Sequence, residues 1–174
     1  MADLTFNTVA GETIKRELLI AYLNTGNAET PVWSPIGSRV TDSSEEMDWS
    51  EETNTDILGV TRTTMKKPVI TQSFDPWELD GADVAGLKIW NLAVKDQNYN
   101  ALTSQDMLIV HCYAGTAGTA MFAERYDACM VKPTSLGGEG GGTVGMPVDV
   151  TYGGNRTVGT ASVSGGTVTF TPEE

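Results

Sequence analysis

The chain has 174 residues, of which 40% are hydrophobic and 20% charged, and its formal net charge at pH 7 is -12. That length suits a single domain that buries roughly 70% of the surface exposed by its unfolded form. The acidic surface repels phosphate backbones, anionic lipid and other copies of the chain, which disfavours tight nucleic-acid binding. Self-association must therefore overcome repulsion through buried area or a local basic segment, unless the acidity serves only to keep the protein soluble.

The first residues show no basic region followed by an apolar run, and no apolar stretch reaches membrane-spanning length. We therefore expect synthesis in a cytoplasm and no membrane partner. Cys112 and Cys129 are the only cysteines, too few for a disulfide framework or a four-ligand zinc site. Both are expected to be small buried side chains.

An early apolar run predicts the first strand pair. Residues 18–23 are apolar, residues 24–27 have turn chemistry, and a second segment with apolar residues runs from Val32 to Val40. We expect two strands around this turn, although the run by itself also fits a short helix. Pro31 and Pro35 restrict the second segment to an edge or interrupted strand.

Charge is segregated in the next segment. Residues 42–56 contain no Lys or Arg and seven carboxylates: Asp42, Glu45, Glu46, Asp48, Glu51, Glu52 and Asp56. Residues 57–67 then carry three basic side chains, Arg62, Lys66 and Lys67, before a strand-like segment at 69–74. The pattern predicts one long hairpin with an acidic strand, a basic loop tip and a return strand.

Residues 80–99 have the pattern of a helix. Asp80 or Asp83 can cap its first turn, and polar residues recur at spacings of three and four. Small residues beside Trp90 on the opposite side indicate a helix lying close on a sheet. We expect Trp90 to be its core anchor.

The second half of the chain reads as antiparallel strands. Residues 107–114 and 121–131 flank a glycine-containing loop, as in a hairpin, and a glycine-rich meander fills about 137–174. Together the segments predict a mainly β (α+β) fold, an antiparallel β-sandwich or barrel with one flanking helix, in a single domain over 1–174 with an N-terminal arm of about 1–16.

No catalytic constellation is recognisable. His111, the only histidine, lies in an apolar run and is expected to be a partly buried strand residue. Residues 140–145 match G-x-G-x-x-G, but an extended segment follows where a dinucleotide site needs a helix. The carboxylates near Gly81 fit helix capping better than a calcium site. We expect no catalytic residue, metal or cofactor, and not an enzyme.

Read in order, the segments resemble the major tail-tube proteins of long-tailed, siphophage-type bacteriophages. The resemblance spans nearly the whole chain and rests on the central helix and on four segments, Leu19–Asn24, 33–37 (WSPIG), 56–59 (DILG) and 146–154 (MPVDVTYGG). It extends in fold to tube proteins of contractile-injection and type VI secretion systems.

The resemblance implies a structural subunit that self-assembles into stacked hexameric rings, the tail tube of a virion, built in the bacterial host cytoplasm. It implies a tape-measure, a terminator and a distal tail protein as partners, and DNA as transient cargo only. The long loop of about 54–67 would reach the adjacent ring. We expect this inter-ring interface to comprise Ile57, Leu58, Arg62, Met65, Lys66 and Lys67 on one side and Glu45, Glu46, Glu51 and Glu52 on the other.

Two alternatives remain open. One is a tube protein of a prophage-derived injection particle. The other is a β-sandwich module that binds glycans or proteins, which would need an exposed aromatic platform formed from Trp33, Trp49, Trp77 or Trp90.

Overall fold

The computed structural model describes residues 4–173, and its centre is a hairpin of two long strands. β7 (Gln105–Thr116) and β8 (Ala120–Pro133) are antiparallel, with a shift in register between His111 and Gly115. This is the hairpin that the two apolar runs predict.

The other strands extend this hairpin on both sides. The main path of the sheet is β2 (Trp33–Ile36), β1 (Leu19–Asn24), β7, β8, β9 (Val148–Tyr152), β6 (Val69–Phe74) and β3 (Glu45–Asp48). β10 (Arg156–Ser164) also pairs with β8, and β11 (Thr167–Pro172) pairs with β10. Every pairing is antiparallel, and β2 and β3 lie at opposite ends of the path, so the sheet is not a closed barrel.

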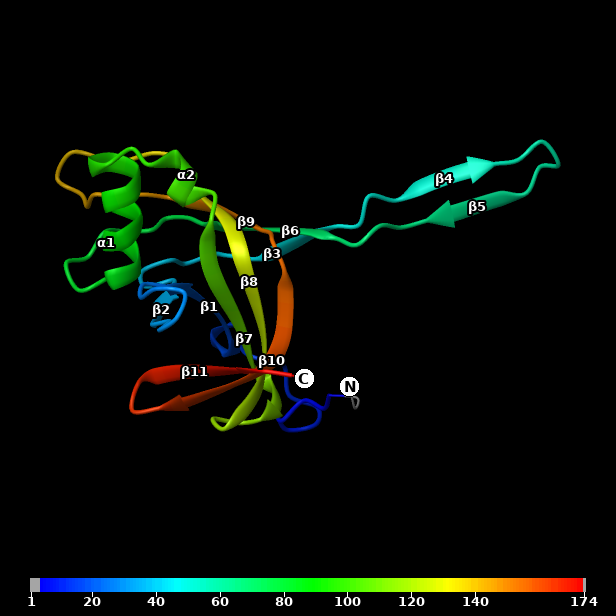
Figure 1. Cartoon of the computed structure of the whole chain (residues 1–174), viewed down its shortest axis with the longest axis horizontal. Coiled ribbons are helices and arrows are strands. Elements are labelled where there is room, and N and C mark those ends of the chain that lie inside the picture. Colours follow the sequence, from blue (N-terminus) through cyan, green and yellow to red (C-terminus); the bar gives the residue numbers. More distant parts are fainter. Residues whose placement is uncertain (1–3, 174) are drawn as a thin grey trace.

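Both faces of the central strands are buried. Along β7, Met107 and Ile109 belong to one apolar core and Leu108 and Val110 to another, because successive side chains of a strand point to opposite faces. The first core is covered by helix α1 and the second by the β10–β11 hairpin (Figure 1). The fold is therefore mainly β with a flanking helix, in a sandwich-like arrangement.

The helical segment is shorter than the range 80–99 that the sequence predicts. A short 3-10 turn, η1 (Arg16–Leu18), precedes the first strand. The main helix, α1 (Val84–Trp90), has Asp83 as its N-cap, passes into a π-helical turn, η2 (Asn91–Lys95), and is followed by α2 (Tyr99–Leu102). Gln97 has a positive φ of 47°, which interrupts the helical path, and Asn98 caps the next helix.

The helix packs on the first core through residues beside Trp90. Ala85 and Ile89 are fully buried, whereas Trp90 is half-buried and packs against the edge of this core. Trp77 is fully buried below the helix, and its Nε1 donates to the capping carboxylate of Asp83 over 2.7 Å. One carboxylate thus ties the helix start to the largest core side chain.

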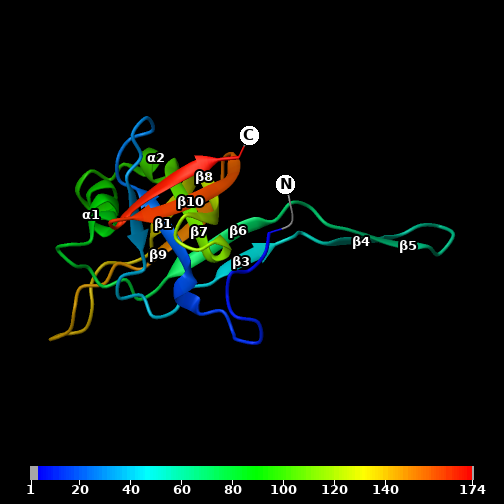
Figure 2. The ribbon, with the colours of Figure 1, turned by 90° about the horizontal axis from the view of Figure 1, so that it is seen from below.

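A long two-stranded projection leaves the body from β3 and β6. Beyond them the chain forms β4 (Glu52–Thr55) and β5 (Thr61–Thr64), which pair with each other and with no other strand of the described chain. Figures 1 and 2 show this projection, residues 49–67, which we call the arm, pointing away from the body. The hairpin expected between residues 42 and 74 is present.

The helix contact generates a stability prediction. Ile89→Ala should lower the free energy of unfolding by about 2 to 5 kcal/mol, the usual range for a buried aliphatic truncation. Trp90→Ala should also destabilise the protein, because its ring covers the edge of the same core. Urea denaturation measures both, with exposed Leu87→Ala as the control. Unchanged midpoints for the Ile89 and Trp90 variants would contradict this packing.

Candidate self-assembly surface

The arm has no apolar core of its own. All the residues of β4 and β5 are exposed, and the strands are joined across one face by threonine pairs, Thr53 with Thr63 and Thr55 with Thr61. A hairpin that is not packed on a third element is marginally stable in water. The arm therefore gains little stability from packing within the described residues.

The turn at the end of the arm is held by Asp56. Its Oδ1 accepts hydrogen bonds from the backbone N–H groups of Leu58 and Val60, and Oδ2 accepts one from Arg62 over 2.9 Å. The N–H groups of Val60 and Leu58, followed by Arg62, lower the pKa of the Asp56 carboxyl. Gly59 supplies the positive φ of 79° that the turn requires. These contacts give the turn a defined backbone conformation.

Two large apolar side chains are exposed on this turn. The exposure of Ile57 is 102% of its reference value and that of Leu58 is 84%. They are among the most exposed large apolar residues of the described chain. They belong to the turn between β4 and β5, which is the end of the arm farthest from the body (Figure 1). Burying each from water would contribute about 1.5 to 3 kcal/mol to an association.

The basic residues do not form the tip, contrary to the sequence-based expectation of a basic loop tip. Arg62 lies on β5 opposite Asn54 and pairs with Asp56 of its own chain. Lys66 and Lys67 follow β5 near the arm's base, are exposed and make no ion pair within residues 4–173. The tip is apolar because the turn places residues 57–60 beyond the last strand pair.

The ten residues expected at an inter-ring interface are not all equally placed. Eight lie on the arm or at its base and are exposed: Glu46, Glu51, Glu52, Ile57, Leu58, Met65, Lys66 and Lys67. Arg62 is exposed but already paired. Glu45, on β3, is half-buried and close to the charges of Arg16, His111 and Glu124.

A buried ionic cluster lies where the sheet branches. Glu124 of β8 bonds His111 Nε2 over 2.9 Å, accepts from the hydroxyl of Tyr126 over 3.0 Å and accepts from Nε of Arg156. Burial opposes its ionisation, but the hydrogen bonds from His111 and Arg156 outweigh burial and lower the pKa of Glu124 to about 2. The cluster therefore fixes β7, β8 and β10 to one another through an ionised carboxylate.

Glu45 borders this cluster from β3. Burial, reinforced by the negative charge of Glu124, raises its pKa, while His111 and Arg16 lower it less. Its Oε1 is buried and accepts no hydrogen bond from any of residues 4–173. His111 is a partly buried strand residue, as the sequence predicts, but the sequence does not predict its hydrogen-bond partners. The sequence signal for these partners is Glu124 itself, a charged residue within an apolar strand.

Other candidate chemistry is sparse in the part of the chain that is described. Residues 4–173 contain no group of three or more His, Cys, Asp or Glu side chains arranged to hold a metal ion. Within the same residues no helix is long and apolar enough to cross a membrane. Cys129 is fully buried and Cys112 half-buried, and both are free thiols.

The tryptophans do not form an exposed aromatic platform. Trp33 and Trp77 are buried in different cores, and Trp90 is half-buried at the helix. Trp49 is exposed, at the base of the arm. A glycan-binding surface of stacked rings is thus not built from these four side chains.

Comparison with known proteins supports the fold. No protein-family profile and no curated protein matches the sequence. A solved chain of the sheath/tube terminator of an extracellular contractile injection system, in its extended state, is 12% identical with a TM-score of 0.50, over 86% of this chain and 99% of that chain. The fold is accordingly of the tail-tube type.

Two further solved chains also resemble it. One, from the sheath-tube complex of such an injection system, is 13% identical with a TM-score of 0.49, over 86% of this chain and 93% of its own. The other, from the tube-terminating cap of an anti-feeding prophage, is 16% identical with a TM-score of 0.47, over 89% of this chain and 96% of its own.

The ionic cluster predicts a pH-dependent variant. Glu124→Gln should lower the free energy of unfolding at pH 7 by about 1.5 to 3 kcal/mol, because it removes a charged hydrogen-bond acceptor. Since the pKa of Glu124 is lowered from 4.5 to about 2, its contribution is complete above pH 4.5 and is lost as the pH falls toward 2. The difference from the unsubstituted protein should shrink over that window.

Urea denaturation at a series of pH values measures this difference. Asp149→Asn is the matched control, because Asp149 pairs with Lys132 at the surface, where an ion pair contributes about 0 to 1 kcal/mol. Equal effects of the two substitutions at pH 7 would contradict the role given to Glu124.

Proposed function

We propose that this chain is a structural, non-enzymatic subunit that self-assembles into a tube. The observation that carries the proposal is the arm, a coreless hairpin with an uncovered apolar tip, on a body of tail-tube type. A hairpin of this kind is stabilised when a neighbouring subunit covers it. Six-membered rings stacked into a tube are the arrangement that the sequence resemblance implies.

The tube would belong to a virion tail or to a prophage-derived injection particle. In the first, it conducts the genome into the host, with tape-measure, terminator and distal tail proteins as partners and DNA as transient cargo. An acidic subunit suits this role, because a basic lumen would retain DNA through salt-dependent phosphate contacts. The second is favoured by the fold likeness to a terminator of an extracellular contractile injection system.

The contact between rings would combine adhesion and selection. Ile57, Leu58 and Met65 supply apolar area, and the charges set register and partner. Because Arg62 is paired within its own arm and Glu45 is half-buried, the charge selection falls mainly to Lys66 and Lys67. Their partners in the adjacent ring would be Glu46, Glu51 or Glu52, all exposed.

Charge reversal tests this contact. The triple variant with Arg62, Lys66 and Lys67 all changed to Glu should remain folded but assemble more slowly and into shorter tubes, as light scattering and electron microscopy would show. The double variant Lys66→Glu with Lys67→Glu should behave similarly, because Arg62 is already paired with Asp56 and contributes little to the contact between rings. A compensating Glu51→Lys with Glu52→Lys should partly restore growth.

Lys15→Glu is the control, because Lys15 is exposed and lies before η1 and β1, outside the arm. Tubes of normal length and growth rate from both reversal variants would show that the arm's charges have no role in stacking.

A further inference from the structure

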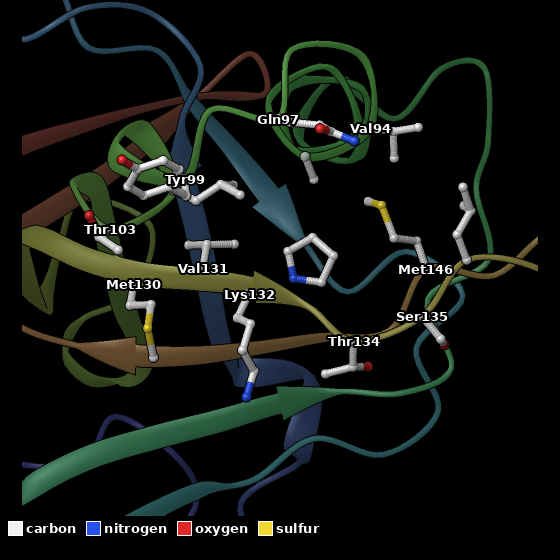
Figure 3. Close-up of a pocket in the computed structure, with 14 residues that line it drawn as sticks. Val94, Gln97, Tyr99, Thr103, Met130, Val131, Lys132, Thr134, Ser135 and Met146 are labelled. Carbon is white, nitrogen blue, oxygen red and sulfur yellow. The ribbon is translucent and has the colours of Figure 1, made fainter.

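A groove on the far side of the body is left uncovered. It has a volume of about 560 Å³ and lies between the helical segment 93–103 and the end of β8 with the residues that follow it. Figure 3 shows Val94 and Gln97 above Met130 and Lys132, with Met146 at one end. Its lining includes large apolar side chains that are partly or largely exposed, namely Val94, Tyr99, Met130 and Leu136.

The groove has unusual electrostatics for so acidic a chain. Its lining contains no Asp or Glu, and Lys132 is its one charged residue. By contrast, the hollow beside β3 and β6 is lined by Asp42, Glu46, Asp75 and Asp149. Covering a carboxylate with an apolar side chain is unfavourable, so an apolar ligand is accepted more readily by the groove.

The arm tip is the complementary surface. It presents Ile57 and Leu58, and the charge of Asp56 in its turn is neutralised by Arg62 of β5. It can therefore approach another copy without the repulsion that the net charge of -12 imposes on other surfaces. A rigid turn also loses little conformational freedom on binding.

The two surfaces cannot meet within one molecule. The arm points away from the body on the side opposite α1 and α2 (Figure 1), and residues of α2 line the groove. The arm spans about nine residues beyond β3, or roughly 30 Å at the rise of an extended strand. Each copy thus carries one tip and one groove, which is the arrangement of a heterologous, repeating contact.

We propose that the groove of one copy receives Ile57 and Leu58 of the arm tip of another copy. The proposal rests on the proposed self-assembly and names the receiving surface. A contact between unlike surfaces builds a ring or an extended assembly, whereas a self-complementary contact would stop at a dimer.

Cross-linking tests the contact directly. Three changes are combined in one chain: Cys112→Ser removes the accessible native thiol, Leu58→Cys marks the tip and Leu136→Cys marks the groove. Mild oxidation under assembly conditions should give a ladder of covalent dimers, trimers and longer species on a non-reducing gel. A disulfide needs Cα atoms about 4.4–6.8 Å apart, so the ladder reports close contact.

The matched control replaces Leu136→Cys with Ser164→Cys, an exposed position at the end of β10, next to the β10–β11 turn. It should give little product. A second pair of variants avoids thiols: Val94→Glu should raise the protein concentration needed for assembly at least about tenfold, a penalty of about 1.4 kcal/mol per contact. Leu87→Glu, on an exposed part of α1 outside the groove, should not.

The outcomes separate the two proposals. If tubes form but the Leu58–Leu136 ladder is absent or no stronger than the Ser164 control, the groove is not the receptor, although self-assembly stands. The same follows if Leu136→Cys stays open to maleimide in assembled tubes, since the groove would then be uncovered. If the unsubstituted chain forms no assembly at any concentration, both proposals fail.

Discussion

The pairing of β8 with three other strands determines the rest of the structure. Residues 121–126 of β8 lie between β7 and β10, and residues 130–133 pair with β9 instead. One continuous strand thereby belongs to two diverging parts of the sheet, and it contributes Met121 and Ala123 to one apolar core and Tyr126, Cys129 and Val131 to the other. Glu124 lies at this branch, and its ion pair with Arg156 holds the start of β10 against β8.

This branch also positions the two ends of the molecule. β9 leads through β6 to β3 and so to the arm, while the end of β8 forms one wall of the groove. The groove is therefore attached to β8 directly, and the tip is attached to it through β9, β6 and β3. Repeated head-to-tail contact requires such a fixed relation, because a flexible one would give irregular aggregates.

The acidity of the chain and its proposed self-assembly are compatible because the charge is unevenly distributed. Carboxylates crowd residues 42–56, whereas the tip is neutral, the arm's return strand is basic and the groove lacks carboxylates. Most orientations of two copies are repelled, so the few permitted orientations are selected. Charge then provides specificity and apolar burial provides affinity.

The sequence predicted the features that depend on local patterns. The β7–β8 hairpin follows from two apolar runs around a glycine loop, and the arm from charge segregation between two strand-like segments. The sequence also offers Asp80 or Asp83 as the helix cap, because capping is a local signal, and Asp83 is the residue that caps α1. The early end of the helix could not be predicted, because it depends on the left-handed backbone of Gln97, a residue type with no strong preference for it.

Features that depend on distant pairings escaped prediction. Glu124 and Arg156 are 32 residues apart and meet only because β10 returns to β8. The groove combines the helical segment with the end of β8 and with Met146, which no sequence spacing reveals. Likewise, the apolar tip was recognisable as apolar, but only the register of Asn54 with Arg62 places the basic side chains behind it.

Electron microscopy of the purified chain at increasing concentration, in low and moderate salt, tests the central claim most directly. Self-assembly through the arm predicts rings that stack into hollow tubes without any added cofactor, with density for the arm lying on a neighbouring copy. Fields of single subunits at every concentration and salt, with arms projecting freely into solvent, would contradict it.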